Sequence, residues 1–161
     1  MKMDHADYMK LAIEEAWKGQ KTGEVPVGAV LVSAQGVVLS AAHNQPIRLS
    51  DPTGHAEILV LREYTKKISN YRALDTTIYV TLEPCVMCMG AIIHARVSCV
   101  VYGAKDPKWG AAGSVYDFPA DEKLNHRPEI IGNVCQAACR ALIQDFFRSK
   151  RKSVATNQIM S

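Results

Sequence analysis

Short apolar runs alternate with helical segments through the middle of this chain, and this alternation leaves few folds open to it. β-branched and aromatic residues fill the runs at 77–82 (TIYVTL) and 98–103 (SCVVYG), a composition typical of buried strands. Helical spacing over 55–69 and 84–96 places a helix before each of these runs. Because two strands that a helix connects within one sheet run parallel, the sequence predicts an α/β fold.

The remaining segments complete a sheet with helices on both faces. Apolar runs at 27–33 and 37–43, separated by the turn residues 34–36, predict an antiparallel hairpin. A mixed central sheet of about five strands, covered on both faces, is therefore expected. The other expected elements are a helix over 5–21, a long loop over 104–128, a last strand over 129–134 and a last helix over 135–150.

The chain length suits one folded unit. With 161 residues and no repeat or linker, the chain can bury one sizeable core. We expect a single domain over 1–152 and a frayed C-terminal tail over 153–161. The N-terminus lacks the apolar run of a signal peptide, and no apolar run is long enough to span a bilayer. These features predict a cytoplasmic protein.

The positive charge of the chain is concentrated near its C-terminus. Residues 1–140 carry equal numbers of acidic and basic residues, so the formal net charge of +3 lies entirely beyond them. There, the cations between Arg148 and Lys152 are opposed by Asp145 alone. Such a cluster can bind phosphates, but cations also suit the negative end of a solvated helix. Charge alone leaves both interpretations open.

Three residues at two predicted helix starts could bind one metal ion. Cys85 and Cys88 lie three apart at a helix start, where they share a face and where the helix dipole stabilises thiolates. His55 begins the preceding helix, and the two helix starts can meet at one edge of the sheet. Catalytic zinc usually has three protein ligands and a water, whereas structural zinc usually has four. The set therefore favours a catalytic zinc site over a redox-active or merely buried Cys pair.

The other histidines and cysteines have plainer interpretations than a fourth ligand. Cys99 lies inside an apolar strand, and His94 lies within an apolar helix, where we expect it to pack. His43 ends a strand and could line the pocket. Cys135 and Cys139, four apart on the last predicted helix, are expected to be buried thiols.

Glu57 could supply the proton transfer that a metal ion cannot. A carboxylate beside a catalytic metal accepts a proton from water and returns it later in the reaction. A glutamate in the first turn of a helix also simply complements the dipole. Since residues two apart in a helix do not share a face, the catalytic role requires His55 to lie at the helix entrance, outside the regular helix.

The complete pattern, His55-Ala56-Glu57 followed by Pro84-Cys85-Val86-Met87-Cys88, is the signature of the zinc-dependent nucleobase deaminases. From about Tyr8 to Arg148 the chain resembles the bacterial tRNA-specific adenosine deaminases of the cytidine/deoxycytidylate deaminase superfamily. The resemblance implies a three-layer α/β/α cytidine-deaminase-like fold. The stretches that carry it are 24–32, 51–58, 79–96, 103–114 and 125–130.

The resemblance also implies an activity, the hydrolytic deamination of adenosine to inosine at the wobble position of a tRNA anticodon. It implies one zinc ion per subunit, a homodimer, and an RNA site built from both subunits. A deaminase of a free base or nucleoside, of guanine or cytosine type, is the alternative enzyme. A zinc-stabilised RNA-binding module without activity is the alternative outside enzymes.

The resemblance further assigns roles to individual residues. Zinc would be bound by His55, Cys85 and Cys88, protons would be carried by Glu57, and the base would be hydrogen-bonded by Asn44. Contacts to RNA would come from Lys105, Asp106, Lys108, Phe147 and Arg148.

Overall fold

The sheet has five strands in the order β2-β1-β3-β4-β5 in this computed structural model, which describes residues 2–160. The strands are β1 (Gly28–Ser33), β2 (Val38–His43), β3 (Thr76–Leu82), β4 (Cys99–Ala104) and β5 (Glu129–Ile131). β1 runs antiparallel to both β2 and β3, whereas β3, β4 and β5 are mutually parallel. The predicted hairpin, the parallel pair and the mixed sheet are therefore confirmed.

Helices cover both faces of this sheet. On one face lie α1 (His5–Lys21) and the first half of α5 (Gln136–Met160), and on the other lie α3 (Ala56–Ile68) and α4 (Val86–His94). The crossover from β3 through α4 to β4 joins two parallel strands, as the sequence predicted. No helix in the described part of the chain is both long and apolar enough to span a membrane.

Alternation along the strands divides the core into two layers. Ala29 and Leu31 of β1 face the layer shared with α3 and α4. Val30 and Val32 face the layer shared with α1 and α5. All four are buried, as a strand covered on both faces requires.

Two short elements escaped the sequence analysis. α2 (Pro46–Leu49) interrupts the polar segment after β2, and a 3-10 turn, η1 (Phe118–Ala120), lies in the long loop before β5. Both begin at or near a proline, which suits the first helical position. Single turns of this kind are too short to leave a periodic pattern in the sequence.

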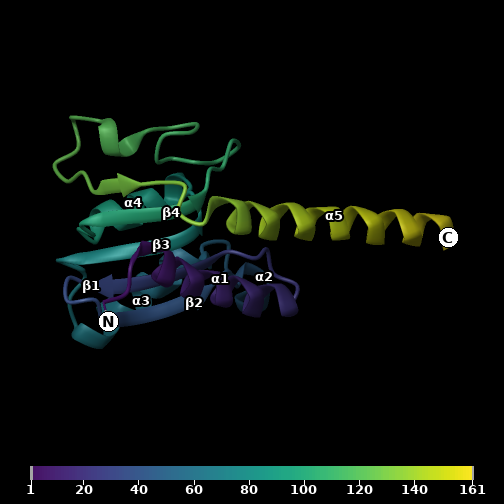
Figure 1. Cartoon of the computed structure of the whole chain (residues 1–161), viewed down its shortest axis with the longest axis horizontal. Helices are drawn as coiled ribbons and strands as arrows, with labels where there is room; N and C mark the ends of the chain where they lie inside the picture. Colours follow the sequence, from purple (N-terminus) through teal and green to yellow (C-terminus); the bar gives the residue numbers. More distant parts are fainter. Residues whose placement is uncertain (1, 161) are drawn as a thin grey trace.

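α5 is longer than the sequence predicted. Instead of ending near residue 150, it continues to Met160, and the segment expected to fray is helical over 153–160. Ser161 lies outside the described residues. Figure 1 shows the second half of α5 projecting away from the sheet, and every residue from Phe147 to Met160 is exposed. The helix continues because this stretch contains no glycine or proline and is rich in helix-forming residues.

Candidate metal centre and substrate surface

Two helix entrances bring the predicted metal ligands together. His55 is the N-cap of α3 and Cys85 is the N-cap of α4, both with extended backbone (φ −75°, ψ 152° and φ −76°, ψ 177°). Neither side chain caps its own helix, so both are free for other contacts. Because His55 lies outside the regular helix, it and Glu57 can reach the same point, as the sequence analysis required.

The spacing of the three side chains suits zinc. His55 Nδ1 lies 3.7 Å from Cys85 Sγ and 3.5 Å from Cys88 Sγ, and all three ligand atoms lie within 4.8 Å of one another. Bonds of about 2.3 Å to sulfur and about 2.0–2.1 Å to nitrogen at a tetrahedral zinc put ligand N and S atoms roughly 3.6 Å apart. Within residues 2–160, this is the one group of three His, Cys, Asp or Glu side chains close enough to bind a metal.

The two thiols of this group differ in their affinity for a proton. A hydrogen bond from Cys88 is the main reason that the pKa of Cys85 falls to about 4. That same hydrogen bond, together with burial, raises the pKa of Cys88. The hydrogen bond with Cys85 also raises the pKa of His55. These shifts favour the thiolate form of Cys85 and the protonated form of Cys88.

Glu57 is a buried carboxyl group in contact with the metal-ligand group. Its side chain is 3% exposed, and its Oε2 accepts a hydrogen bond from the Cys88 thiol at 3.4 Å. Burial raises the pKa of Glu57 and outweighs the opposing effect of that hydrogen bond. A carboxyl group with a raised pKa beside a metal site is suited to both accepting and donating a proton.

Asn44 caps α3 in place of His55. Its Oδ1 accepts a hydrogen bond from the backbone N–H of Ala56 at 2.8 Å, and its own backbone N–H donates to the carbonyl of Val27 at 3.0 Å. The side chain is buried. Asn44 is thus fixed at the start of α3, next to His55, through its side-chain oxygen.

Comparison with known proteins agrees with a metal-binding role for this group. The family model of the cytidine and deoxycytidylate deaminase zinc-binding region matches residues 2–104. This chain belongs to the cytidine and deoxycytidylate deaminase family. Within this family it is 46% identical to the tRNA-specific adenosine deaminase of Haemophilus influenzae, over 89% of this chain and 83% of the relative. It is 43% identical to that of Bacillus subtilis, over 90% and 89%.

The present chain shares its fold with a solved structure from a study of A-to-I editing by tRNA:A34 deaminases at the wobble position of transfer RNA. The two superpose with a TM-score of 0.81 at 38% identity, over 84% of this chain and 97% of the other. The three-layer α/β/α cytidine-deaminase-like fold expected from the sequence is therefore confirmed.

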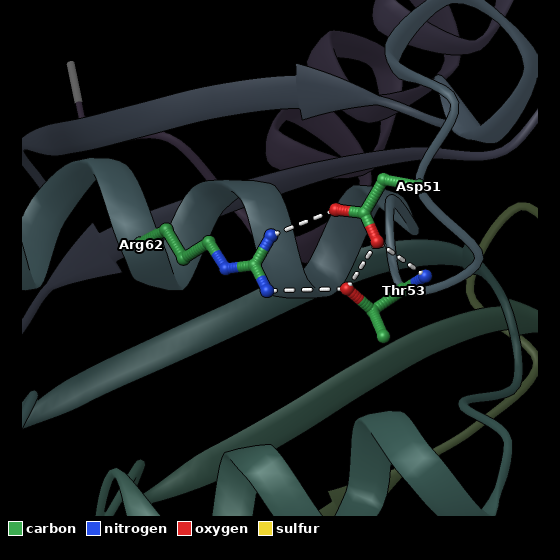
Figure 2. A network of polar contacts seen from close by, with 3 residues as sticks. All are labelled: Asp51, Thr53 and Arg62. Atoms are coloured by element: carbon green, nitrogen blue, oxygen red, sulfur yellow. Dashed lines mark hydrogen bonds and ion pairs between the residues drawn. The ribbon is translucent and has the colours of Figure 1, made fainter.

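A polar network fixes the segment that leads into His55 in this deaminase-family chain. Asp51 Oδ1 accepts hydrogen bonds from the backbone N–H and the hydroxyl of Thr53, at 2.8 and 2.7 Å. Arg62, on α3, donates to Asp51 Oδ2 and to Thr53 Oγ1, each at 3.1 Å (Figure 2). The hydrogen bonds from Thr53 lower the pKa of Asp51. The loop before α3 is thereby tied to the helix that carries Glu57.

The segment 105–116, here called the β4 loop, approaches the metal-ligand group through an isolated bridge between Gly110 and Cys85. Asp106 Oδ1 accepts hydrogen bonds from the backbone N–H groups of Lys108 and Trp109, at 3.0 and 3.2 Å, so its carboxylate shapes the loop. Lys105 and Lys108 are exposed, and the Trp109 side chain is also open to solvent.

Lys108 meets α5 along one groove. This groove, of about 450 Å³, is lined by Lys108, Ile143, Gln144, Phe147, Arg148 and Arg151. Phe147 is 43% exposed and packs edge-on against Phe146, which is buried, with 5.3 Å between the ring centroids. Three of the predicted RNA-contacting residues, Lys108, Arg148 and the exposed Phe147, therefore line one basic groove together with Arg151. Lys105 does not line this groove.

None of the possible fourth ligands joins the metal-ligand group among the described residues. Cys99 is buried in β4, and His43 Nδ1 lies 3.1 Å from the carbonyl oxygen of Asn44. The expectation that His94 packs inside its helix was wrong, because His94 is the last residue of α4 and faces solvent. Cys139 is a buried thiol as expected, whereas Cys135 is only half-buried.

Sequence reasoning missed two buried glutamates, Glu24 and Glu83, which hold the segments on either side of the centre. Glu24 accepts hydrogen bonds from the first N–H groups of α2, and Glu83 accepts hydrogen bonds from the β4 loop. Each glutamate directly adjoins an apolar run or the Pro84-Cys85 motif, and a charged residue in that position is the signal that could have revealed them.

Proposed function

We propose that this chain is a zinc-dependent hydrolase that converts adenosine to inosine at the wobble position, A34, of a tRNA anticodon. The observation that carries the proposal is the His55, Cys85 and Cys88 group with buried Glu57 in contact with it. The high identity to tRNA-specific adenosine deaminases over most of the chain supports adenosine in tRNA as the substrate. Residues 1–152 would form the deaminase domain, with the rest of α5 extending beyond it.

The donor set suits one zinc ion per subunit. Zinc would be held by two sulfurs and one imidazole nitrogen, a donor set of three protein ligands that is typical of catalytic sites. When bound, zinc supplies the Lewis acidity that activates a water molecule near neutral pH. His55 and Cys85 would hold the ion from the entrances of α3 and α4, and Cys88 would hold it from the first turn of α4.

Glu57 would carry the protons of the reaction. It would accept a proton from the attacking water and deliver it to N1 of adenine, and then take the proton of the new C6 hydroxyl and give it to the departing amino group. The new C6–O bond replaces the C6–N bond, so that adenosine and water give inosine and ammonia. Burial keeps the pKa of Glu57 above its usual range, which suits a group that must both accept and donate within one turnover.

Recognition of the target base would depend on Asn44 and on an unpaired nucleotide. Because its Oδ1 is engaged by Ala56, Asn44 would donate from Nδ2 to an acceptor on the purine. The base must be splayed out of its stack to reach the metal, and an anticodon loop offers such a base at low cost.

The nucleotides flanking the target would lie along the β4 loop and α5. Lys108, Phe147 and Arg148 line one groove, where cations meet phosphates and an aromatic ring can stack on a base. Lys105 would add a phosphate contact, and Asp106 would act by shaping the loop. We also propose a homodimer, from the family resemblance, and a cytoplasmic location, where tRNA is found.

The experiment is deamination of a short anticodon stem-loop with adenosine at position 34, measured by sequencing inosine as guanine. Free adenosine, guanine and cytidine are assayed beside it for release of ammonia. The catalytic variant is Glu57→Ala, and the matched control is Glu63→Ala, which removes an exposed glutamate from the same helix.

We expect inosine in the stem-loop with the native chain and with Glu63→Ala, and none with Glu57→Ala. Ammonia from guanine or cytidine, without editing of the stem-loop, would replace the proposal with a free-base or nucleoside deaminase. Binding of zinc and RNA without any turnover would indicate a zinc-stabilised RNA-binding module.

A further inference from the structure

A buried carboxylate at the end of β3 holds the β4 loop. Glu83 is 2% exposed and directly precedes Pro84 and Cys85. Its Oε2 accepts hydrogen bonds from the Asp106 N–H, at 3.0 Å, and from the Ser114 hydroxyl. Its Oε1 accepts from the N–H groups of Ala112 and Ser114, at 3.1 and 3.0 Å. Two oxygens that accept four hydrogen bonds use the full acceptor capacity of an ionised carboxylate.

The surrounding backbone is built to receive this carboxylate. A side chain at Gly110 would place its Cβ 2.2 Å from Glu83 Oε2, so only glycine leaves room for the carboxylate there. The N–H of Ala111 donates to the carbonyl of Pro84 at 2.8 Å, and Gly110 forms an isolated antiparallel bridge with Cys85. The loop is therefore fastened to the segment that carries a metal ligand.

The conformation of the β4 loop, which Glu83 stabilises, determines the position of Lys108. The Asp106 N–H donates to Glu83, while the Asp106 carboxylate accepts from the N–H groups of Lys108 and Trp109. This turn places Lys108 in the groove with Phe147. Without the carboxylate, three backbone N–H groups of the loop would lose their acceptor, which a loop in this conformation does not tolerate.

We propose that Glu83 is a positioning residue for RNA. It holds the β4 loop so that Lys108 meets the nucleotides that flank the target adenosine, and it touches neither the base nor the metal. This inference rests on the proposed function, since it assigns the loop to RNA. It predicts that Glu83 acts mainly on substrate binding and that Glu57 acts on the chemical step.

Glu24 provides a matched comparison within the same molecule. It is 1% exposed, and its Oε1 accepts hydrogen bonds from the N–H groups of Ile47 and Arg48, at 2.9 and 3.2 Å. Glu24 is therefore a glutamate as deeply buried as Glu83, but it holds the segment after β2 instead of the β4 loop. Loss of Glu24 should therefore loosen a different part of the substrate surface.

The experiment compares Glu83→Gln with Glu24→Gln as full-length, zinc-loaded protein. A glutamine offers one acceptor oxygen and turns its NH₂ toward N–H donors. Hydrogen exchange, followed by mass spectrometry at a temperature well below unfolding, reports on each loop separately. Steady-state kinetics on the anticodon stem-loop separate KM from kcat.

For Glu83→Gln we expect at least about tenfold faster exchange in peptides covering 105–116 and unchanged exchange in 45–54. The pattern should reverse for Glu24→Gln. KM for the stem-loop should rise by about tenfold to a hundredfold in Glu83→Gln, with kcat within about threefold of native. Unchanged exchange in 105–116, or an unchanged KM despite faster exchange, would overturn the proposal.

If Glu83→Gln does not fold, Ser114→Ala tests the same proposal. Ser114 is exposed, and its replacement removes one donor to the carboxylate without burying a new group. We expect the same changes on a smaller scale, with about a threefold rise in KM, and no change in KM would contradict the proposal. The exchange comparison requires no substrate, so it tests the hold of Glu83 on the loop even if the native chain does not deaminate RNA.

Discussion

Cys88 Sγ lies 3.4 Å from Glu57 Oε2, although 31 positions separate the two residues in the chain. One side chain therefore belongs both to the metal-ligand group and to the surroundings of the carboxylate that would carry protons. The contact also means that a change in the proton or charge on Cys88 is felt by Glu57. Metal loading and the chemistry of Glu57 are coupled through this thiol.

Zinc binding should release protons in a pH-dependent way. Since the pKa of Cys85 is lowered to about 4 and that of Cys88 is raised, the number of protons released per zinc near neutral pH should include one from Cys88 and none from Cys85. The number should rise as the pH falls, because the raised pKa of His55 favours its protonated ring, which must lose a proton to bind zinc. Zinc affinity should accordingly weaken as the pH falls.

Calorimetric titration of the metal-free chain, in buffers of different ionisation enthalpy, measures this number. Removal of zinc by a chelator should abolish deamination, and added zinc should restore it. A number of released protons that stays constant or decreases as the pH is lowered would contradict this prediction.

Asn44 should show separate structural and catalytic effects. Asn44→Ala removes the acceptor for the Ala56 N–H and should lower the free energy of unfolding by about 1 kcal/mol, the usual cost of a lost cap. Asn44→Asp keeps that acceptor but loses the amide donor, so stability should stay close to native while deamination falls. Urea unfolding and the stem-loop assay measure the two effects. Full activity of Asn44→Asp would exclude the proposed contact between Nδ2 and the base.

The sequence predicted those parts of the site that depend on local pattern. His55 and Cys85 occupy helix entrances, and helix starts can be recognised from the apolar spacing that follows them. The order of strands and helices followed from the same periodicity. The position of Glu57 beside the ligands could also be predicted. Residues two apart within a helix do not share a face, so His55 and Glu57 can meet only if His55 lies at the helix entrance.

The parts that escaped prediction depend on contacts distant in sequence. Glu83 acts through N–H groups that lie 23–31 positions later in the chain. Its place beside the Pro84-Cys85 motif could have marked it as unusual, but its sequence neighbours do not reveal these partners. His94 was expected to be packed because its sequence neighbours are apolar, but the end of a helix turns it to solvent. The outer half of α5 persists as helix without a core partner, which local propensity alone could have indicated.

Buried thiols and a tyrosine should limit stability at alkaline pH. Burial raises the pKa of Cys99 to about 11 and those of Cys139 and Tyr79 to about 12. Their unfolded values lie near 9 for the thiols and 10 for the phenol. The folded state therefore binds these protons more tightly. This contribution is intact below about pH 9 and is lost as the pH rises through 11 to 12.

Cys139→Ala should flatten this decline. The variant loses some packing at every pH, but its free energy of unfolding should fall less steeply than that of the native chain above about pH 9. Leu142→Val, a buried and non-titrating position on the same helix, should lower stability equally at all pH values. Urea unfolding across the alkaline range measures both, and parallel curves for Cys139→Ala and native chain would refute the assignment.

The basic groove should determine how RNA affinity depends on salt. Arg151 lines the groove with Lys108 and Arg148, and each phosphate that a cation neutralises contributes about 0.7–0.9 to the slope of log affinity against log salt. Arg151→Gln should weaken binding of the stem-loop and reduce that slope by about one contact. Lys10→Gln, on α1 and paired with Asp7 at 3.7 Å, is the matched control with an unchanged slope. Fluorescence anisotropy between about 50 and 200 mM salt measures the slope. If the slope for Arg151→Gln equals that of the native chain, RNA does not bind along this groove. Arg151 would then be a solvated cation near the end of α5.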